Sequence, residues 1–242
     1  TQSGYKNHFR PIANDLSQGS APADYAINTL KAKSAAIIHD KQAFGQGVAE
    51  VFRDTFTKDG GNITSFSGVT QTDVDFSALL TSIRSENPDV IYFGGVMPAV
   101  GLFVKQAREF GIKSTIFGAD SAFSSDFING AGPENAEGAI VSFQAPPYDS
   151  SPELEAFAKS YRDAFGEDAG PYSAYGFVEA SVILEAMKKL PAPLTRKAIA
   201  EEIAKTDLKT MVGTVSFKPD GELTNPFIFL YKVDGGKFAL VK

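Results

Sequence analysis

Short apolar runs alternate with amphipathic segments along roughly the first 145 residues of the chain. The runs have the length of strands, and Ile37–Ile38 and Val90–Ile91 are apolar at successive positions, which is typical of strands that are covered on both faces. They occupy Ala35–His39, Asn62–Val69, Val90–Phe93, Thr115–Gly118 and Ala139–Phe143. This alternation of strand-like and helix-like segments predicts an α/β fold built on a parallel sheet.

The segments between these runs carry a single apolar stripe with helical spacing. One stripe follows i, i+3, i+4, i+7 and another i, i+3, i+4, i+8, which predicts amphipathic helices. Their members are Phe76, Leu79, Leu80 and Ile83 in the first, and Val48, Val51, Phe52 and Phe56 in the second. Asn87–Pro88 and Gly111 are typical helix stops, so we expect one helix to end at Asn87 and a helix from Pro98 to Phe110 to end at Gly111.

The pattern changes from about Tyr148. Helical segments follow one another with little strand between them, at Pro152–Phe165, Ser173–Leu190 and Thr195–Thr206. Near the end, Val212–Phe217 and Pro226–Val233 are strand-like and flank a turn at Lys218–Gly221. A second structural region is therefore predicted, with apolar helix faces and few strands of its own to cover them.

Composition narrows the function. The chain has 242 residues, of which 43% are hydrophobic and 21% charged, and a formal net charge of -6, with no Lys/Arg-rich block; this argues against nucleic acid as a partner. Without cysteine there is no disulfide, Cys-zinc site or thiol nucleophile. His8 and His39 lie too far apart for metal-ligand spacing, and no Ser/His/Asp arrangement is present. We expect no cofactor, no metal and no catalysis.

Ligands of open parallel sheets bind at the carboxyl ends of the strands, which selects the loops His39–Phe44, Gly94–Met97 and Ala119–Ser121. Gly45–Gln46–Gly47 forms only the first half of a dinucleotide fingerprint, because Glu50 stands where the third glycine is needed. A glycine-cradled phosphate is therefore not expected. His39 is interpreted as a strand-end residue that bonds to the backbone.

Two residues in these loops have a structural and a functional interpretation. Phe44 either staples the entry of the next helix against the sheet or contacts a ligand. Asp120 either caps the next helix or is a buried anion that accepts charge-assisted hydrogen bonds from a ligand's ammonium group. For Asp120 the two roles are compatible.

Several motifs together resemble the leucine/isoleucine/valine-binding proteins, the type I periplasmic solute-binding subunits of ABC importers. They are IIHDKQAFGQG at 37–47, DFSALLTSIRSENPDVIYFGG at 75–95, GAD at 118–120, GPY at 170–172 and VGTVSFKPDG at 212–221. The resemblance covers nearly the whole chain, with the motifs in family order. It implies two α/β lobes that hold an amino acid in the cleft between them.

The resemblance also implies a domain division. A complete C-terminal lobe, a doubly wound parallel sheet, comprises residues 14–144 and 227–242. A partial N-terminal lobe with crossing segments comprises residues 1–13 and 145–226. Thr1–Gly4–Tyr5 resembles the family just after its first-lobe ligand loop, so the first part of that lobe is expected to lie outside this chain.

Four ligand-binding residues follow from the resemblance. Phe44 stands where the family commonly has a tyrosine, and Val96 where an aromatic ring often lies over the ligand. Asp120 stands where a glutamate usually binds the α-ammonium group, and Tyr172 matches an aromatic that touches the ligand side chain from the other lobe. A smaller residue at 96 leaves room for a larger ligand, and a shorter carboxylate at 120 still balances an ammonium.

The function implied is that of an extracytoplasmic solute-binding protein, not an enzyme. It captures a small branched-chain or other aliphatic amino acid by cleft closure and delivers it to the membrane permease of an ABC importer. Its expected location is the periplasm, or the cell exterior with a lipid anchor. The alternatives are a ligand-sensing receptor domain with the same fold and a binder of another small carboxylate such as an aromatic acid. Self-association through the uncovered helix faces is a further possibility; a nucleotide-dependent enzyme is disfavoured by the failed glycine fingerprint.

Overall fold

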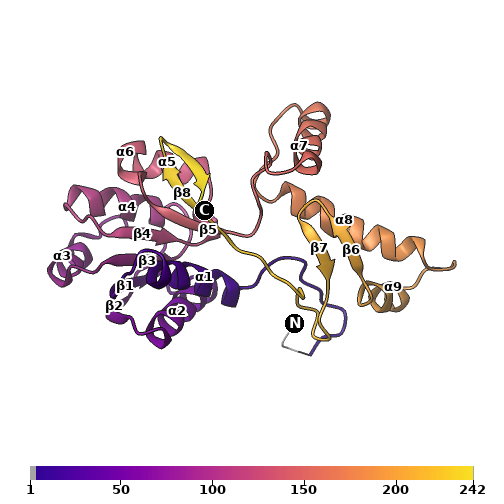
Figure 1. Cartoon of the computed structure of the whole chain (residues 1–242), viewed down its shortest axis with the longest axis horizontal. Helices are drawn as coiled ribbons and strands as arrows, with labels where there is room; N and C mark the ends of the chain where they lie inside the picture. The colour runs from indigo at the N-terminus through magenta and orange to yellow at the C-terminus, as the bar shows by residue number, and fades with distance from the viewer. Residues whose placement is uncertain (1–3, 242) are drawn as a thin grey trace. The chain divides into compact units, whose positions relative to one another are not determined.

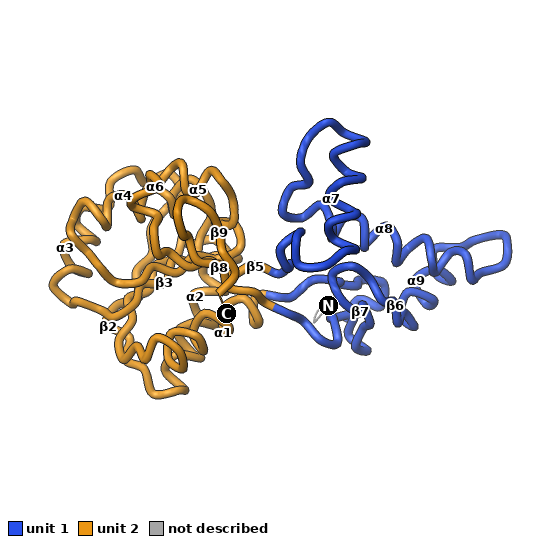
Figure 2. The backbone as a smooth tube through the Cα atoms, turned by 45° about the horizontal axis from the view of Figure 1, so that its top comes forward, with its two compact units in different colours: residues 1–14, 144–227 blue, residues 15–143, 228–242 orange. Residues whose placement is uncertain are grey.

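A computed structural model describes residues 4–241, so Thr1 at the start of the predicted N-terminal segment and residue 242 at the chain end lie outside the described residues. The chain divides into two compact units. Unit 1 contains residues 1–14 and 144–227, and unit 2 contains residues 15–143 and 228–242 (Figure 2). The assignment of lobes to these parts of the chain remains a prediction.

Unit 2 is built on a seven-stranded sheet with the order β2-β1-β3-β4-β5-β8-β9. The strands β1 to β5 run parallel, and β8 and β9 add an antiparallel edge. Their bounds are β1 (Ser34–His39), β2 (Asn62–Gly68), β3 (Val90–Gly94), β4 (Thr115–Gly118), β5 (Ile140–Phe143), β8 (Phe229–Asp234) and β9 (Lys237–Leu240). The predicted α/β fold with a mostly parallel sheet is confirmed.

Helices cover both faces of this sheet (Figure 1). On one side lie α1 (Asp15–Asn28) and α2 (Ala43–Lys58), and on the other α4 (Ala99–Glu109), α5 (Ser125–Ala131) and α6 (Pro133–Ala136). The remaining helical elements of the unit are α3 (Ser77–Glu86) and the short 3-10 helix η1 (Asp120–Ala122). The two predicted stops are found, since Asn87 (φ 49°) and Gly111 (φ 76°) take the left-handed conformation after α3 and α4.

The core of unit 2 is rich in aromatic rings. Phe52 of α2 stacks on Tyr92 of β3 with ring centroids 4.4 Å apart, and on Phe56 at 5.6 Å. The two helices on this face approach closely at Gly19, where a Cβ atom would lie 2.6 Å from the carbonyl oxygen of Val48. This contact holds α1 tightly against α2 and so fixes the residues beside Gly19.

The longest regular elements of unit 1 are helices. These are α7 (Pro152–Phe165), α8 (Ser173–Lys188) and α9 (Arg196–Ile203), accompanied by a two-stranded antiparallel sheet of β6 (Asp207–Thr210) and β7 (Gly213–Ser216). Val178 and Val182 of α8 form a small core with Val215 and Leu223. The other side of α8 leaves Phe177 and Leu184 more than half exposed, in agreement with the predicted shortage of covering strands.

Some elements differ from the predictions. The sequence patterns missed α1, because its buried face consists largely of small residues and Pro22 lies inside it. They also missed β6 and β9, which are four residues long and contain no buried residue. The strand predicted at Pro226–Val233 begins only at Phe229 and pairs with β5, whereas β7 pairs with β6, so the two late strands belong to different sheets.

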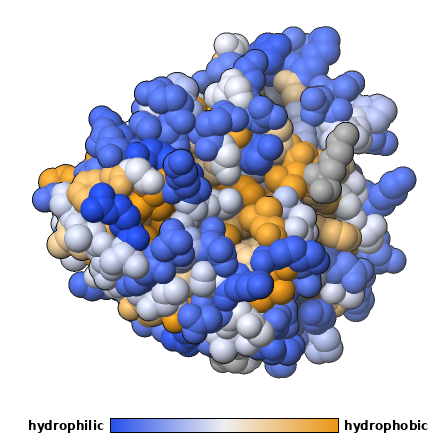
Figure 3. Space-filling model, turned by 60° about the vertical axis from the view of Figure 1, so that its left-hand side comes forward, coloured by the Kyte–Doolittle hydropathy of each residue, from blue (hydrophilic) through white to orange (hydrophobic). Residues whose placement is uncertain are grey.

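Hydrophilic residues dominate the face shown in Figure 3, with hydrophobic residues visible in patches between them. Among residues 4–241, no helix combines the length and the apolar character that crossing a bilayer requires.

Candidate functional site

The candidate site is the carboxyl edge of the parallel sheet in unit 2. The chain order reverses between β1 and β3, which are neighbours in the sheet, and ligands of such sheets bind outside the strand ends at this reversal (Figure 1). His39 pairs with Gly94, so β1 and β3 end level with each other. The loops after β1, β3 and β4 therefore meet at one edge.

The loop after β1 is held by hydrogen bonds to its neighbours. The buried Asp40 carboxylate accepts from the backbone N–H of Gln42 at 3.0 Å and from Nε2 of Gln71 at 2.9 Å. The Asp40 N–H donates to the Gly94 carbonyl at 3.0 Å, which joins this loop to the end of β3. The His39 prediction is confirmed, because its Nδ1 accepts from the N–H of Lys41 at 3.2 Å. Burial lowers the pKa of His39 below its ordinary value.

Of the two glycines after this loop, Gly45 serves helix packing. A Cβ atom at Gly45 would lie 2.5 Å from the Gly94 carbonyl oxygen and would also overlap the Asp40 carboxylate. Conversely, a Cβ atom at Gly94 would overlap the carbonyl oxygen of Gly45. At Gly47, by contrast, an added Cβ atom would meet no atom of the described residues within 4 Å. Gly45 is thus needed where the first turn of α2 crosses the end of β3.

Phe44 is the second residue of α2 and is partly buried against the core of unit 2. It lies within the helix, so the interpretation as a staple ahead of the helix is wrong in position, although the packing against the core is found. Its contact with a ligand remains a prediction.

Asp120 follows β4 and begins η1. The predicted capping role is wrong: Ala119 precedes η1, and the cap of α5 is Ser124, whose Oγ accepts from the N–H of Phe127. The partly buried Asp120 carboxylate instead accepts a hydrogen bond from Nε2 of Gln18, in α1, at 3.3 Å. The next residue, Ser121, donates from Oγ to the Gly95 carbonyl at 2.7 Å, so the loops after β3 and β4 are tied together.

The Asp120 carboxylate lies close enough to the buried Tyr92 hydroxyl to affect its pKa. Burial raises the pKa of the Tyr92 hydroxyl above its ordinary value, and the charges of Asp120 and Asp15 raise it further. The two carboxylates thus act on the same buried hydroxyl group. Carboxylates attract a nearby cation and repel a nearby anion.

Sequence reasoning missed Gln18 and Tyr92. Gln18 lies on a helix that the hydrophobic pattern did not reveal, and Tyr92 was predicted only as a strand residue. No sequence motif indicates that either residue contributes a polar group to the site.

The remaining two predicted residues lie in different units. Val96 is partly buried in the loop directly after β3, so Phe44, Val96 and Asp120 belong to the same sheet edge of unit 2. Tyr172 belongs to unit 1, where it precedes the first residue of α8 and is 46% exposed. Its part in ligand binding remains a prediction.

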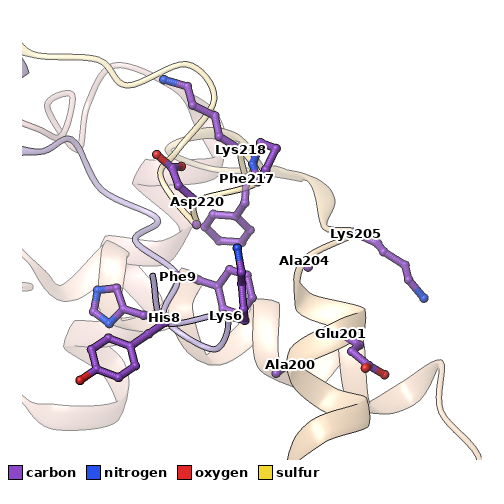
Figure 4. A pocket seen from close by; sticks show the side chains of 13 residues that line it. Lys6, His8, Phe9, Ala200, Glu201, Ala204, Lys205, Phe217, Lys218 and Asp220 are labelled. Atoms are coloured by element: carbon purple, nitrogen blue, oxygen red, sulfur yellow. The ribbon is translucent and has the colours of Figure 1, made fainter. Parts of the chain in front are cut away.

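A cavity of about 570 Å³ lies within unit 1 (Figure 4). It is bounded by the segment near Phe9, by α9 and by the turn at Lys218–Gly221, with the rings of Phe9 and Phe217 5.1 Å apart. None of the four predicted ligand-binding residues lines it.

Comparison with known proteins agrees with this fold. A sequence model described as "Periplasmic binding protein" matches residues 1–237. The chain belongs to the periplasmic binding protein family.

Among the similar proteins, an amino acid binding protein of Pseudomonas aeruginosa is 32% identical over 98% of this chain and 63% of its own length. A leucine-specific-binding protein of Salmonella typhimurium is 32% identical over 92% of this chain and 60% of its own length. A crystal structure of the leucine-binding protein LivK of Thermotoga maritima superimposes with a TM-score of 0.89, at 28% identity, over 99% of this chain and 68% of that one. The chain thus spans about three fifths of the length of these two curated relatives.

Proposed function

We propose that this chain belongs to an extracytoplasmic solute-binding protein that captures an amino acid with a branched or other aliphatic side chain. The observation that carries the proposal is the Asp120 carboxylate, which lies at the carboxyl edge of a parallel sheet and is held by Gln18. Relatives of this chain include proteins that are named for binding amino acids and for binding leucine. These names support an amino acid as the ligand.

An α-ammonium group fits this position for electrostatic reasons. A carboxylate that is partly removed from water gains about 1.5–3 kcal/mol from a hydrogen bond to a charged donor. The charges of Asp120 and Asp15 both raise the pKa of the nearby Tyr92 hydroxyl. An ammonium group next to this edge is attracted to the carboxylate, and an anion in the same place is repelled.

The side chain of the ligand is matched by apolar residues. Phe44 and Val96 follow β1 and β3 at the same edge, and each methylene group that they shield from water contributes about 0.8 kcal/mol. Capture by cleft closure, with Tyr172 on the ligand side chain, is part of the proposal. The protein performs no chemistry on the ligand, delivers it to the permease of an ABC importer, and works in the periplasm or lipid-anchored outside the cell.

The proposal is tested by thermal unfolding in the presence of L-leucine, L-isoleucine, L-valine and L-phenylalanine. A ligand at 100 times its Kd stabilises the folded chain by about 2.7 kcal/mol, which raises the melting temperature by several degrees. At least one aliphatic amino acid should produce this shift.

Asp120→Asn is the matched variant, since it keeps the shape of the side chain and removes its charge. The variant should melt near the wild-type temperature without ligand and should lose the ligand-induced shift. An equal shift in the variant, or a shift with nucleotides and with no amino acid, contradicts the proposal.

A further inference from the structure

Two buried polar side chains lie in the surroundings of Asp120. Gln18 is 3% exposed, and its Nε2 donates to Asp120 Oδ2 at 3.3 Å. Its Oε1 atom is buried and has no hydrogen-bond partner among residues 4–241. The Tyr92 hydroxyl, under the charge of Asp120, is likewise buried and lacks a partner within the described part of the chain.

Both side chains are placed by rigid packing. Gln18 precedes Gly19, the residue at which α1 and α2 come into backbone contact. Tyr92 is fully buried, and its ring stacks on Phe52 at 4.4 Å. Side chains held in this way lose little further freedom when a ligand binds, so the groups they present are preorganised.

These polar atoms cost folding stability. Buried polar groups are nearly always hydrogen-bonded in native proteins, and one without a partner opposes folding. Methionine at position 18 and phenylalanine at position 92 fill similar space without that cost. The packing of the core therefore does not explain the Gln18 amide or the Tyr92 hydroxyl. The nearby Asp120 carboxylate does explain polar groups at these two positions.

We propose that Gln18 is a positioning residue for Asp120 and sets the preference for ligands that carry an ammonium group. Its amide N–H donates to the carboxylate and so fixes the direction in which the carboxylate points. The Tyr92 hydroxyl, on which the charge of Asp120 acts, is a second buried polar group in the same surroundings. This inference rests on the proposed amino-acid binding and assigns the residue on which its selectivity depends.

The test compares two ligands that differ only in the charged group. L-Leucine carries an ammonium, and 2-hydroxy-4-methylpentanoate carries a hydroxyl at the same carbon. Their dissociation constants are measured by ligand-observed NMR titration for the wild-type chain and for Gln18→Met, which keeps the approximate shape and removes the donor. The variant should bind leucine about tenfold more weakly, as expected for a lost hydrogen bond to a charged group, with an unchanged affinity for the hydroxy acid.

Gln106→Met is the control for a general loss of hydrogen bonding. The Gln106 amide accepts from the N–H of Phe76 and donates to the Val74 carbonyl, both at 2.8 Å, so its replacement disturbs the entry of α3 and not Asp120. This control should keep the wild-type ratio between the two ligands.

The outcomes separate the two proposals. If the wild-type chain binds no leucine, the proposed function itself fails. If the wild type binds leucine and Gln18→Met binds it equally well, or loses both ligands to the same extent, the positioning role is overturned.

Discussion

Replacing Gly45 with alanine tests how α2 is seated on the sheet. The added Cβ atom would lie 2.5 Å from the Gly94 carbonyl oxygen and would overlap the Asp40 carboxylate. Neither group can move without a cost in free energy, because the Gly94 carbonyl is strand backbone and the Asp40 carboxylate accepts hydrogen bonds from Gln42 and Gln71. Overpacking of this kind costs about 1–3 kcal/mol.

The matched variant is Gly47→Ala in the same helix. An added Cβ atom there would meet nothing within 4 Å among the described residues, and Gly47 lies in the interior of α2. Alanine in a helix interior is favoured over glycine by roughly 0.5–1 kcal/mol. The two substitutions are chemically identical and only two residues apart, yet they should change stability in opposite directions.

The assay is thermal unfolding followed by circular dichroism. For a chain of this size about 1 kcal/mol corresponds to roughly 2–4 °C, so Gly45→Ala should melt about 2–12 °C lower and Gly47→Ala about 1–4 °C higher. If Gly45→Ala melts at or above the wild-type temperature, the close approach of α2 and β3 is not present in solution and the geometry derived for the sheet edge is wrong.

Two further predictions concern single polar groups. Tyr92→Phe removes a buried hydroxyl that has no hydrogen-bond partner within residues 4–241. The urea midpoint of unfolding should therefore rise by an amount equivalent to about 1 kcal/mol. A clear fall in this midpoint would reveal a hydrogen bond to that hydroxyl. Asp89 accepts from the N–H groups of Lys33 and Ser34 at 2.7 and 3.0 Å, and the bond from Lys33 is the main reason why its pKa lies below the ordinary value of 3.8. Because the pKa of Asp89 is lower in the folded state, its stabilising effect is present above pH 3.8 and is lost as the pH falls through the folded-state value. Between pH 5 and pH 2, Asp89→Asn should therefore lose less stability than the wild type. Parallel curves of the free energy of unfolding against pH, measured with urea, would contradict this.

Much of unit 2 could be predicted from the sequence, because its central strands β1, β3, β4 and β5 are almost entirely buried. Thr115–Gly118 is found with the predicted bounds as β4, and the apolar pair Ile37–Ile38 lies in the fully buried part of β1. Helix α1 was missed because Gly19, Ala23 and Ala26 bury as effectively as large residues when two helices touch, yet they leave no hydrophobic stripe in the sequence. Short exposed strands such as β9 are set by pairing with a neighbour and have little pattern of their own.

The position of the candidate site followed from a topological rule. Parallel strands bring their carboxyl ends to one edge, so Phe44, Val96 and Asp120 could be placed in that edge before any side chain was known. The partner of Asp120 could not be placed in this way. Gln18 precedes it by 102 positions and reaches it only because α1 packs on α2, a contact that depends on tertiary structure.

The central claim is that Asp120 neutralises the ammonium group of a bound amino acid. A crystal structure of the protein with L-leucine tests it most directly. We expect the ligand nitrogen about 2.7–2.9 Å from an Asp120 carboxylate oxygen, the distance of a charge-assisted hydrogen bond. A ligand whose nitrogen lies away from Asp120, and is bound by other groups, would contradict the account.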